Sequence, residues 1–425
     1  MKKLIQHVAL YQDHRVLEGQ NIAIDGSRIT GFPEAPKASE YDEVIDGKGM
    51  LALPGFVNTH NHVAMTVFRS YADDMQLMDW LEKKIWPAEA KLTDDVIYAQ
   101  SMLGIAEMIR CGTTAYADMY DHMDQEARAV EESGIRACLC RGSIGIGPNA
   151  QAGLDENRQL FLDWHGKADG RITVMMGPHA PYTCPPDYLH KFVEARELGA
   201  EIHIHLSETK GEVENIKQQY GKSPIALMDE IGVLDCGCLA AHCVWVDDDD
   251  MDIMAEKHVR VAHNPGSNLK LASGVAPVPK MLAKGITVGL GTDGASSNNN
   301  LDIVEEMRLA TLIHKAHTLD PLVIPAETAL NMLTEGGAKC LGYTDIGKLE
   351  TGYKADITLV DREGLHWYPK NDTLSLMAYS ANSMDVDTVL VNGEVLLRHK
   401  EFTKLDIEKI KAEAERTRKK LFAQI

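Results

Sequence analysis

The chain has 425 residues, of which 44% are hydrophobic and 25% charged, the proportions of a soluble globular protein with a large core. Its length predicts two or three domains. The net charge of −20 argues against a nucleic acid or an anionic membrane surface as the partner, and it favours a small neutral or zwitterionic substrate.

The first residues and the cysteines indicate a cytoplasmic protein. The opening MKKLIQHVALYQDH has a short apolar run but no small-residue cleavage site, so we do not expect a signal peptide. No apolar stretch reaches the length of a membrane span. The eight cysteines are scattered without a paired C-x-x-C framework, and we expect them to be reduced thiols.

The two ends of the chain share a β-rich texture. Residues 1–54 contain short strand-like runs such as NIAID, separated by turn pairs such as Asp25-Gly26. The same texture returns in residues 346–425, where NG in TVLVNGEVLL is a hairpin signal. Neither end has enough strands for a stable sheet, so we expect both to form one small β-sandwich domain. An amphipathic helix should follow in KLDIEKIKAEAERTRKKLFAQI.

The middle of the chain, residues 55–345, alternates apolar strand-like runs with helix-like segments, the pattern of parallel β/α units. Eight such runs occur, in the order ALPGFVNTH, TTAYADMY, RACLCRG, ITVMMGPHA, AEIHIHLSE, CLAAHCVW, VRVAHNP and ITVGLGTDG. Eight is the number that closes a (β/α)8 barrel. We therefore predict an α/β fold, a (β/α)8 TIM barrel with the small β-sandwich built from both chain ends.

Nearly every run ends in polar side chains that can take part in chemistry. In GFVNTHNHVAM, His60 and His62 stand one residue apart and should point to the same side of a strand, close enough for one metal ion. Active sites of such barrels lie at the carboxyl ends of the strands, so the other end residues should meet them there. These are Asp118, Arg141, His179, His205, Glu208, His242, His263 and Asp293.

Four of the strand-end residues make a ligand set for zinc or another divalent ion, which needs three or four nitrogen or oxygen ligands and a position for water. In HIHLSE, His203 shares a strand face with His205 but lies deeper, which favours a core histidine. Asp293 could instead cap the following helix. His263 in AHNP could equally bond within its own loop. The proposed ligands are His60, His62, His205 and Asp293.

Two further strand-end residues fit a hydrolytic reaction. Glu208 is a candidate general acid, because a carboxyl near a metal in a water-poor pocket can be tuned toward neutral pH. His242 could hold the attacking water by a hydrogen bond. A bridging lysine, common at the fourth strand of two-metal barrel hydrolases, is absent from VMMGPHAPYT, which predicts one metal ion per chain. The run DDDD at residues 247–250 lacks the spacing of a calcium loop and should open a helix.

With their surrounding sequence, these motifs resemble the amidohydrolase superfamily and, within it, the 5-methylthioadenosine/S-adenosylhomocysteine deaminases. The H-x-H and TDG elements mark the superfamily, whereas WLEKKIWPAEAKLT and SNLKLASGVAPV narrow the resemblance. The similarity covers essentially the whole chain, in LPGFVNTHNH, MDWLEKKIWPAEAKLT, GTTAYADMY, GPHAPYTCP, IHIHLSET, HNPGSNLKLASGVAPV and GLGTDGASSNNNLD.

The resemblance implies hydrolytic removal of the amino group at C6 of an adenine nucleoside, with one zinc ion and a homo-oligomeric enzyme. It implies the same four metal ligands. Asp293 would accept the proton of the attacking water, His242 would steady the nucleophile and Glu208 would protonate ring N1. The implied substrate contacts are Glu89 to the ribose hydroxyls, His179 and Glu208 to the purine, and Arg141 to the amino-acid tail or nearby sugar.

The chain departs from this resemblance at one place. Many relatives carry a second arginine early in the segment after the third strand, whereas GIGPNAQAGLDENRQL has none before Arg158. We therefore expect methylthioadenosine or adenosine to be handled at least as well as adenosylhomocysteine.

Other functions fit parts of the same pattern. The alternatives are another mononuclear amidohydrolase, such as a guanine deaminase or a triazine chlorohydrolase, which would not need Glu89 as a ribose contact. A non-catalytic nucleoside- or metal-binding relative would not need both Glu208 and Asp293. The ligand set would also accept iron, manganese or nickel.

Overall fold

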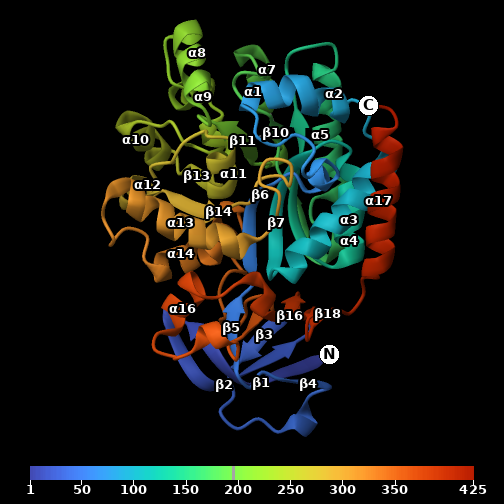
Figure 1. The fold of residues 1–425 in the computed structure, drawn as a ribbon, viewed down its shortest axis with the longest axis vertical. Helices are drawn as coiled ribbons and strands as arrows, with labels where there is room; N and C mark the ends of the chain where they lie inside the picture. The colour runs from blue at the N-terminus through green and yellow to red at the C-terminus, as the bar shows by residue number, and fades with distance from the viewer. Residues whose placement is uncertain (194–196) are drawn as a thin grey trace.

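The computed structural model describes residues 1–193 and 197–425. Segments from both ends of the chain form a β-rich part, and the middle of the chain forms a larger α/β part above it in Figure 1. Within the described residues, no helix is both long and apolar enough to cross a bilayer.

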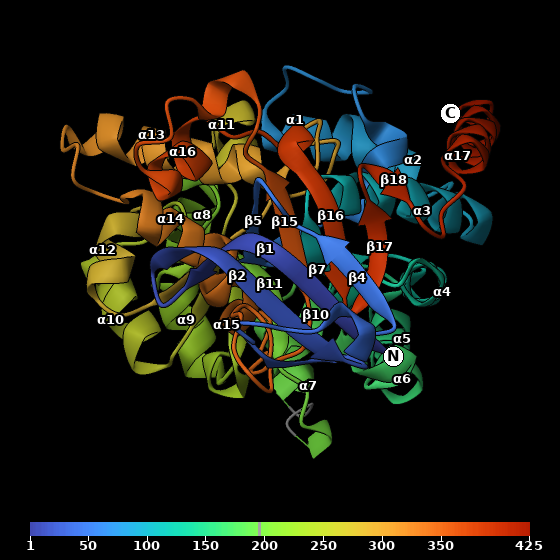
Figure 2. The same ribbon diagram turned by 90° about the horizontal axis from the view of Figure 1, so that it is seen from below.

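The β-rich part is one nine-stranded sheet. Its strands are β1 (Lys2–Gln12), β2 (Arg15–Asp25), β3 (Arg28–Gly31), β4 (Glu43–Asp46), β5 (Met50–Pro54), β15 (Ile357–Asp361), β16 (Val386–Val391), β17 (Glu394–Arg398) and β18 (Glu401–Phe402). The order is β18-β17-β16-β15-β5-β1-β2-β3, with β4 beside β1. Because β5 pairs with β15, the two ends of the chain meet in one sheet, which lies across the underside of the α/β part (Figure 2).

The α/β part is built on two parallel sheets, ordered β10-β8-β7-β6, with β9 beside β8, and β11-β12-β13-β14. Their strands are β6 (Phe56–Asn61), β7 (Thr113–Tyr120), β8 (Arg136–Ser143), β9 (Ile172–Val174), β10 (Gly177–Pro178), β11 (Ile202–Leu206), β12 (Cys238–His242), β13 (Arg260–His263) and β14 (Thr287–Leu290). Each of the eight expected runs contains one of these strands, but ITVMMGPHA is divided into β9 and β10. Strands β7 and β12 are buried throughout, as strands covered on both faces are.

The two parallel sheets contact each other at both edges. A parallel bridge joins Met176 to Ile202 on one side. On the other side, the Thr59 hydroxyl donates to the Leu290 carbonyl at 2.9 Å. The backbone N–H of Asp293 donates to the carbonyl of His60 at 3.0 Å. The carboxyl ends of β6 and β14 are therefore held side by side.

Helices surround the parallel sheets (Figure 1). The longer ones are α3 (Asp94–Arg110), α4 (Met123–Ser133), α5 (Ala150–Trp164), α7 (Pro186–Val193), α8 (Lys210–Tyr220), α9 (Pro224–Ile231), α10 (Asp248–Glu256), α13 (Ile303–Thr318), α14 (Ala326–Leu333), α16 (Thr373–Tyr379) and α17 (Ile407–Phe422). Shorter ones are α1 (Leu77–Trp80), α2 (Trp86–Glu89), α11 (Pro265–Lys270), α12 (Val278–Ala283) and α15 (Glu335–Cys340).

Two helices that the sequence predicts are present in the structure. The run DDDD opens α10, where the Asp247 side chain accepts a hydrogen bond from the backbone N–H of Asp250 at 3.0 Å, so its structural role is confirmed. The expected terminal helix is α17, which lies against α3 of the α/β part rather than on the β-rich part (Figure 1). Gln100 of α3 donates to the backbone carbonyl of Ala414 at 2.7 Å.

Candidate active site

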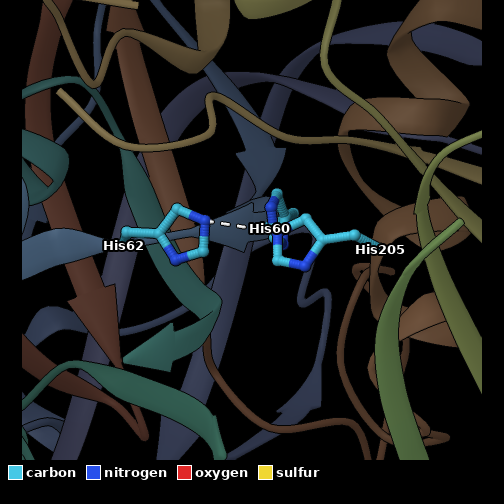
Figure 3. A group of neighbouring side chains, drawn as sticks. All are labelled: His60, His62 and His205. Atoms are coloured by element: carbon cyan, nitrogen blue, oxygen red, sulfur yellow. Dashed lines mark hydrogen bonds between the residues drawn. The ribbon is translucent and has the colours of Figure 1, made fainter. Parts of the chain in front are cut away.

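The four proposed metal ligands meet at the carboxyl ends of strands from both parallel sheets. His60 lies in β6 and His62 directly follows that strand, whereas His205 lies in β11 and Asp293 follows β14. The imidazoles of His60, His62 and His205 turn toward one another (Figure 3). The alternative role of Asp293 as a helix cap is wrong, because Asp302 caps the next long helix, α13.

The spacing of the four donor atoms fits a tetrahedral ion. Oδ1 of Asp293 lies 3.2 Å from Nε2 of His62 and 3.5 Å from Nε2 of His60. The Nε2 atoms of His62 and His205 are 3.4 Å apart, the contact drawn as a dashed line in Figure 3. Tetrahedral ligands at the usual zinc distances of about 2.0–2.1 Å stand about 3.3–3.4 Å from each other. Nε2 of His60 is buried and has no hydrogen-bond partner among the described residues. The site is therefore shaped for a small divalent ion.

Each ligand histidine is oriented through its other ring nitrogen. Nδ1 of His62 lies 2.5 Å from the Met119 carbonyl oxygen, and Nδ1 of His205 lies 2.8 Å from the carbonyl oxygen of His179. Nδ1 of His60 lies 2.9 Å from Nε2 of His203. Carbonyl partners fix the proton of His62 and His205 on Nδ1, which leaves Nε2 as a lone pair for a metal.

Burial and the nearby carboxylate shift the pKa values of the ligands in different directions. For His62, burial alone would lower the pKa, but the Asp293 carboxylate raises it above its ordinary value. Burial lowers the pKa of His60 to about 4 and the pKa of His205 well below its ordinary value. For Asp293, burial alone would raise the pKa, but the adjacent imidazoles of His60 and His62 hold it well below the ordinary value. Neutral imidazoles around an ionised carboxylate are the ligand forms that a divalent cation needs.

The Asp293 carboxylate is held by groups that the sequence motifs did not single out. Its Oδ2 accepts hydrogen bonds from the hydroxyls of Ser267 at 2.6 Å and Ser297 at 2.9 Å, and Oδ1 accepts from the Gly294 N–H at 2.8 Å. Both serines lie in segments whose only sequence signal is family resemblance. Whether their hydroxyls reach Asp293 depends on the conformation of a loop and of the short helix α11, which no residue spacing in the sequence predicts.

The candidate acid Glu208 lies next to His242. Oε2 of Glu208 is 3.9 Å from Nε2 of His242, and burial raises the pKa of the Glu208 carboxyl. Nδ1 of His242 lies 2.9 Å from Oδ1 of the Asn268 side chain, which orients the ring. The Glu212 carboxylate accepts the backbone N–H groups of Ser207 and Glu208 at 2.9 and 2.8 Å, and so fixes the loop that carries the acid.

Three of the strand ends turn sharply at the site. Ser207, His242 and Asp293 have φ values of 51°, 72° and 61°. A left-handed conformation at a residue other than glycine costs on the order of 1–3 kcal/mol and concentrates at functional sites. The surrounding hydrogen bonds compensate for this strain, and the side chains of His242 and Asp293 line one cavity.

A cavity of about 750 Å³, open to solvent, contains most of the predicted site residues. Glu89 lines it, and the Tyr120 hydroxyl donates to Oε1 of Glu89 at 2.8 Å. Burial raises the pKa of Glu89 to about 7 and lowers the pKa of His179 to about 3. Apolar side chains of the segment that contains α1 and α2 close one wall: Leu77, Trp80, Leu81, Ile85 and Trp86.

Other strand-end residues lie elsewhere. The loop-bond alternative for His263 is wrong, because its Nε2 lies 3.1 Å from Nε2 of His314 on α13. Asp118 is buried and accepts the backbone N–H of Val63 at 2.6 Å. Arg141 lines an adjoining second cavity, where it pairs with two carboxylates.

Comparison with known proteins agrees with this geometry. The model of the amidohydrolase family matches residues 51–396. A 5-methylthioadenosine/S-adenosylhomocysteine deaminase of Dictyoglomus turgidum is 52% identical over 417 residues, covering 98% of each chain. One from Moorella thermoacetica is 52% identical over 397 residues, covering 92% of this chain and 93% of the relative.

Solved structures show the same relationship. An adenosine deaminase from Xanthomonas campestris with bound zinc has a TM-score of 0.95 and 31% identity, covering 99% of this chain and 98% of its own. A zinc-complexed atrazine chlorohydrolase from Arthrobacter aurescens has a TM-score of 0.92 and 26% identity, covering 98% of this chain and 100% of its own. The chain therefore belongs to the amidohydrolase family, among the 5-methylthioadenosine/S-adenosylhomocysteine deaminases.

Proposed function

We propose that this protein hydrolytically removes the amino group from C6 of adenine nucleosides, with 5′-methylthioadenosine or adenosine handled at least as well as S-adenosylhomocysteine. One observation carries this proposal. The proposed ligands His62, His205 and Asp293 line one cavity with a buried acid, Glu208, and with Glu89, and His60 lies directly behind them. The names of the relatives, and the adenosine deaminase title of the similar structure, point to the same chemistry.

We assign one zinc ion per chain to His60, His62, His205 and Asp293. The unpartnered Nε2 of His60 and the donor spacing of 3.2–3.5 Å support this assignment. Zinc-containing similar structures favour zinc over the other ions that this ligand set accepts. A bound zinc ion would supply Lewis acidity and lower the pKa of a water molecule toward neutrality.

The reacting protons are handled by two carboxyl groups. Asp293 is ionised, because its pKa is held low, and its position is fixed by Ser267 and Ser297, so it is available to accept the proton of the attacking water. Glu208 delivers a proton to ring N1 as negative charge develops there, a role that its raised pKa favours. His242 is oriented by Asn268 and lies next to Glu208, and it orients the nucleophile by a hydrogen bond. Asp293 then passes its proton to the leaving ammonia.

The remaining cavity residues would hold the nucleoside. Glu89, positioned by Tyr120, is suited to accept hydrogen bonds from the two ribose hydroxyls. His179 faces the purine edge, and its low pKa keeps it neutral. The apolar wall around Trp86 excludes water from the adenine ring.

We also infer the architecture that carries the site. The edge contacts between the two parallel sheets support a closed (β/α)8 barrel over residues 55–345. The sheet shared by both chain ends supports a β-sandwich domain from residues 1–54 and 346–425. The eight cysteines form no paired C-x-x-C framework, which favours the cytoplasm. The negative charge disfavours nucleic acids and membranes as partners. We also expect a homo-oligomer.

Ammonia release tests the function. Purified protein with one equivalent of zinc should release ammonia from adenosine, methylthioadenosine and adenosylhomocysteine, and the absorbance change of adenine to hypoxanthine should match it. Guanine and atrazine in the same screen test the alternative substrates. Turnover of either one, with none of the adenine nucleosides, would overturn the proposal.

A further inference from the structure

All three nitrogens of the Arg141 guanidinium already have partners. Nη2 forms an ion pair with Oδ1 of Asp121, and Nε donates to Oε2 of Glu156 at 2.7 Å. Nη1 donates to the backbone carbonyl of Gly142. A bidentate contact to a substrate carboxylate needs two of these N–H groups on one side of the guanidinium. Three of the five N–H groups of Arg141 are therefore engaged, and a substrate carboxylate would have to share the guanidinium with the carboxylates of Asp121 and Glu156.

Arg141 belongs to a second cavity that adjoins the catalytic one. This cavity, of about 720 Å³ and open to solvent, shares the residue Asp121 with the catalytic cavity. Asp121 directly follows Tyr120, whose hydroxyl donates to Glu89. Tyr120 of β7 lies opposite Arg141 of β8 in the register of the two strands. A substituent on C5′ of a ribose bound at Glu89 would therefore have a route into the second cavity past Asp121.

The charges around the second cavity do not balance. Arg141 is one cation among the carboxylates of Asp94, Asp121, Asp124 and Glu156. His122 lies 2.7 Å from Asp94, and Trp164 donates to Asp124 at 2.7 Å, so these two carboxylates are already engaged. Asp121 and Glu156 surround the guanidinium itself, and together their charges exceed its single positive charge.

We propose that Asp121 and Glu156 are specificity-determining residues that make the enzyme favour nucleosides with a neutral or cationic C5′ substituent over those with an anionic one. The inference rests on the proposed function and names the substrate class of the same site. An incoming carboxylate meets carboxylates that already occupy Arg141, whereas an ammonium group can be shared by them. Losing one hydrogen bond to a charged group costs about 1.5–3 kcal/mol, so the anionic compound should be disfavoured by about 10-fold or more.

Three synthetic substrates that differ only at the end of the tail test this inference. They are adenosines carrying propylthio, 3-aminopropylthio or 2-carboxyethylthio groups at C5′. We expect kcat/KM for the aminopropyl and propyl compounds to exceed the value for the carboxyethyl compound by about 10-fold, because only the last is anionic at neutral pH. High salt should narrow the difference, since the cavity is open to solvent.

Variants then connect the preference to the residues. Glu156→Gln and Asp121→Asn should each raise kcat/KM for the carboxyethyl compound several-fold and lower it for the aminopropyl compound. Arg141→Met, which removes the cation, should lower the carboxyethyl value further. Asp155→Asn is the matched control, because it removes one negative charge from the same helix, α5, at an exposed position that bonds Gln151. It should leave the ratio of the three substrates unchanged.

The possible results separate this inference from the proposed function. No turnover of the neutral propyl compound would overturn the proposed function and the inference with it. Turnover of all three compounds with equal kcat/KM, or a ratio that Glu156→Gln and Asp121→Asn both leave unchanged, would overturn only the inference. A change of the ratio equally large in Asp155→Asn would assign the effect to the general charge of the protein and overturn the inference as well.

Discussion

Nε2 of His203 lies 2.9 Å from Nδ1 of His60, so a buried histidine outside the proposed ligand set directly contacts a ligand. His203 is as buried as a core histidine, as its deeper position in the strand predicted. Its contact gives it a further role, because the partner of the second ring nitrogen sets the orientation and basicity of a ligand histidine.

Replacing His203 should therefore weaken metal binding. His203→Leu removes the partner of Nδ1 of His60 and should lower zinc affinity by about 10–100-fold, measured by competition with a chelator. His203→Gln, whose amide oxygen can accept the same proton, should retain more of the affinity. His263→Leu is the matched control, because His263 is a buried histidine on β13 of the same sheet and contacts His314 instead. Equal losses in the two leucine variants would show that burial alone is responsible.

Metal analysis tests the stoichiometry. After removal of loosely bound ions, the protein should contain about one equivalent of zinc, because the ligand atoms of His60, His62 and His205 lie within 4.8 Å of one another and Oδ1 of Asp293 lies 3.2 Å from His62. Chelation should abolish turnover, and one equivalent of zinc should restore it. Two tightly bound ions, both needed for turnover, would contradict the mononuclear site.

The two carboxyl groups of the site should separate metal binding from proton transfer. Asp293→Asn removes a ligand charge and the proton acceptor, so both zinc content and turnover should be lost. Glu208→Gln keeps the shape of the side chain and lies outside the ligand set, so zinc should stay bound while kcat falls by about 100-fold or more. Near-normal turnover in Glu208→Gln would remove Glu208 from the role of acid.

A pair of buried carboxyl groups behind the site should make stability depend on pH. Glu126 accepts the Tyr116 hydroxyl at 2.9 Å, and its other oxygen and Oδ1 of Asp118 are buried without further partners in the described part of the chain. Burial raises the pKa of both carboxyls above their ordinary values of 4.5 and 3.8. Because the pKa is raised in the folded state, the protonated carboxyls contribute fully to the free energy of unfolding at pH values below their ordinary pKa. This contribution is lost as the pH rises through the folded-state pKa.

Glu126→Gln should flatten this dependence, because the amide keeps the hydrogen bond from Tyr116 and can donate to Asp118 without titrating. Denaturant unfolding at a series of pH values measures the effect, and a tenfold difference in proton affinity between the folded and unfolded states corresponds to about 1.4 kcal/mol. Glu131→Gln, at an exposed position of the same helix α4, serves as the control and should follow the unmodified protein. If the free energy of unfolding varied with pH in the same way in the unmodified protein and both variants, Glu126 would not hold the proton.

That the proposed ligands lie together could be predicted from the sequence, because strand periodicity and the barrel rule are geometric. His60 and His62 share a strand face, and carboxyl ends of parallel strands converge, so His205 and Asp293 had to lie near them. Glu89 could be found only through family resemblance, since a glutamate in a short helix has no periodic signal of its own.

The supporting residues could not be predicted for a different reason. Ser267, Ser297 and Asn268 act through the conformation of loops and one short helix, and Glu212 acts on backbone N–H groups, which no side-chain pattern encodes. The partners of Arg141 come from a loop and a helix that meet only in the folded protein.

The origin of the ligands has a consequence for folding. His62 belongs to one parallel sheet and His205 to the other, and 143 residues of chain separate them. An ion that binds both is a cross-link between two halves of the chain, and closing so long a loop carries an entropic penalty that the ion's binding energy helps to offset. Because the unfolded chain does not preform such a site, zinc at 100 times its dissociation constant would stabilise the folded state by about 2.7 kcal/mol. The zinc concentration would then determine the stability of the folded chain as well as its catalytic activity.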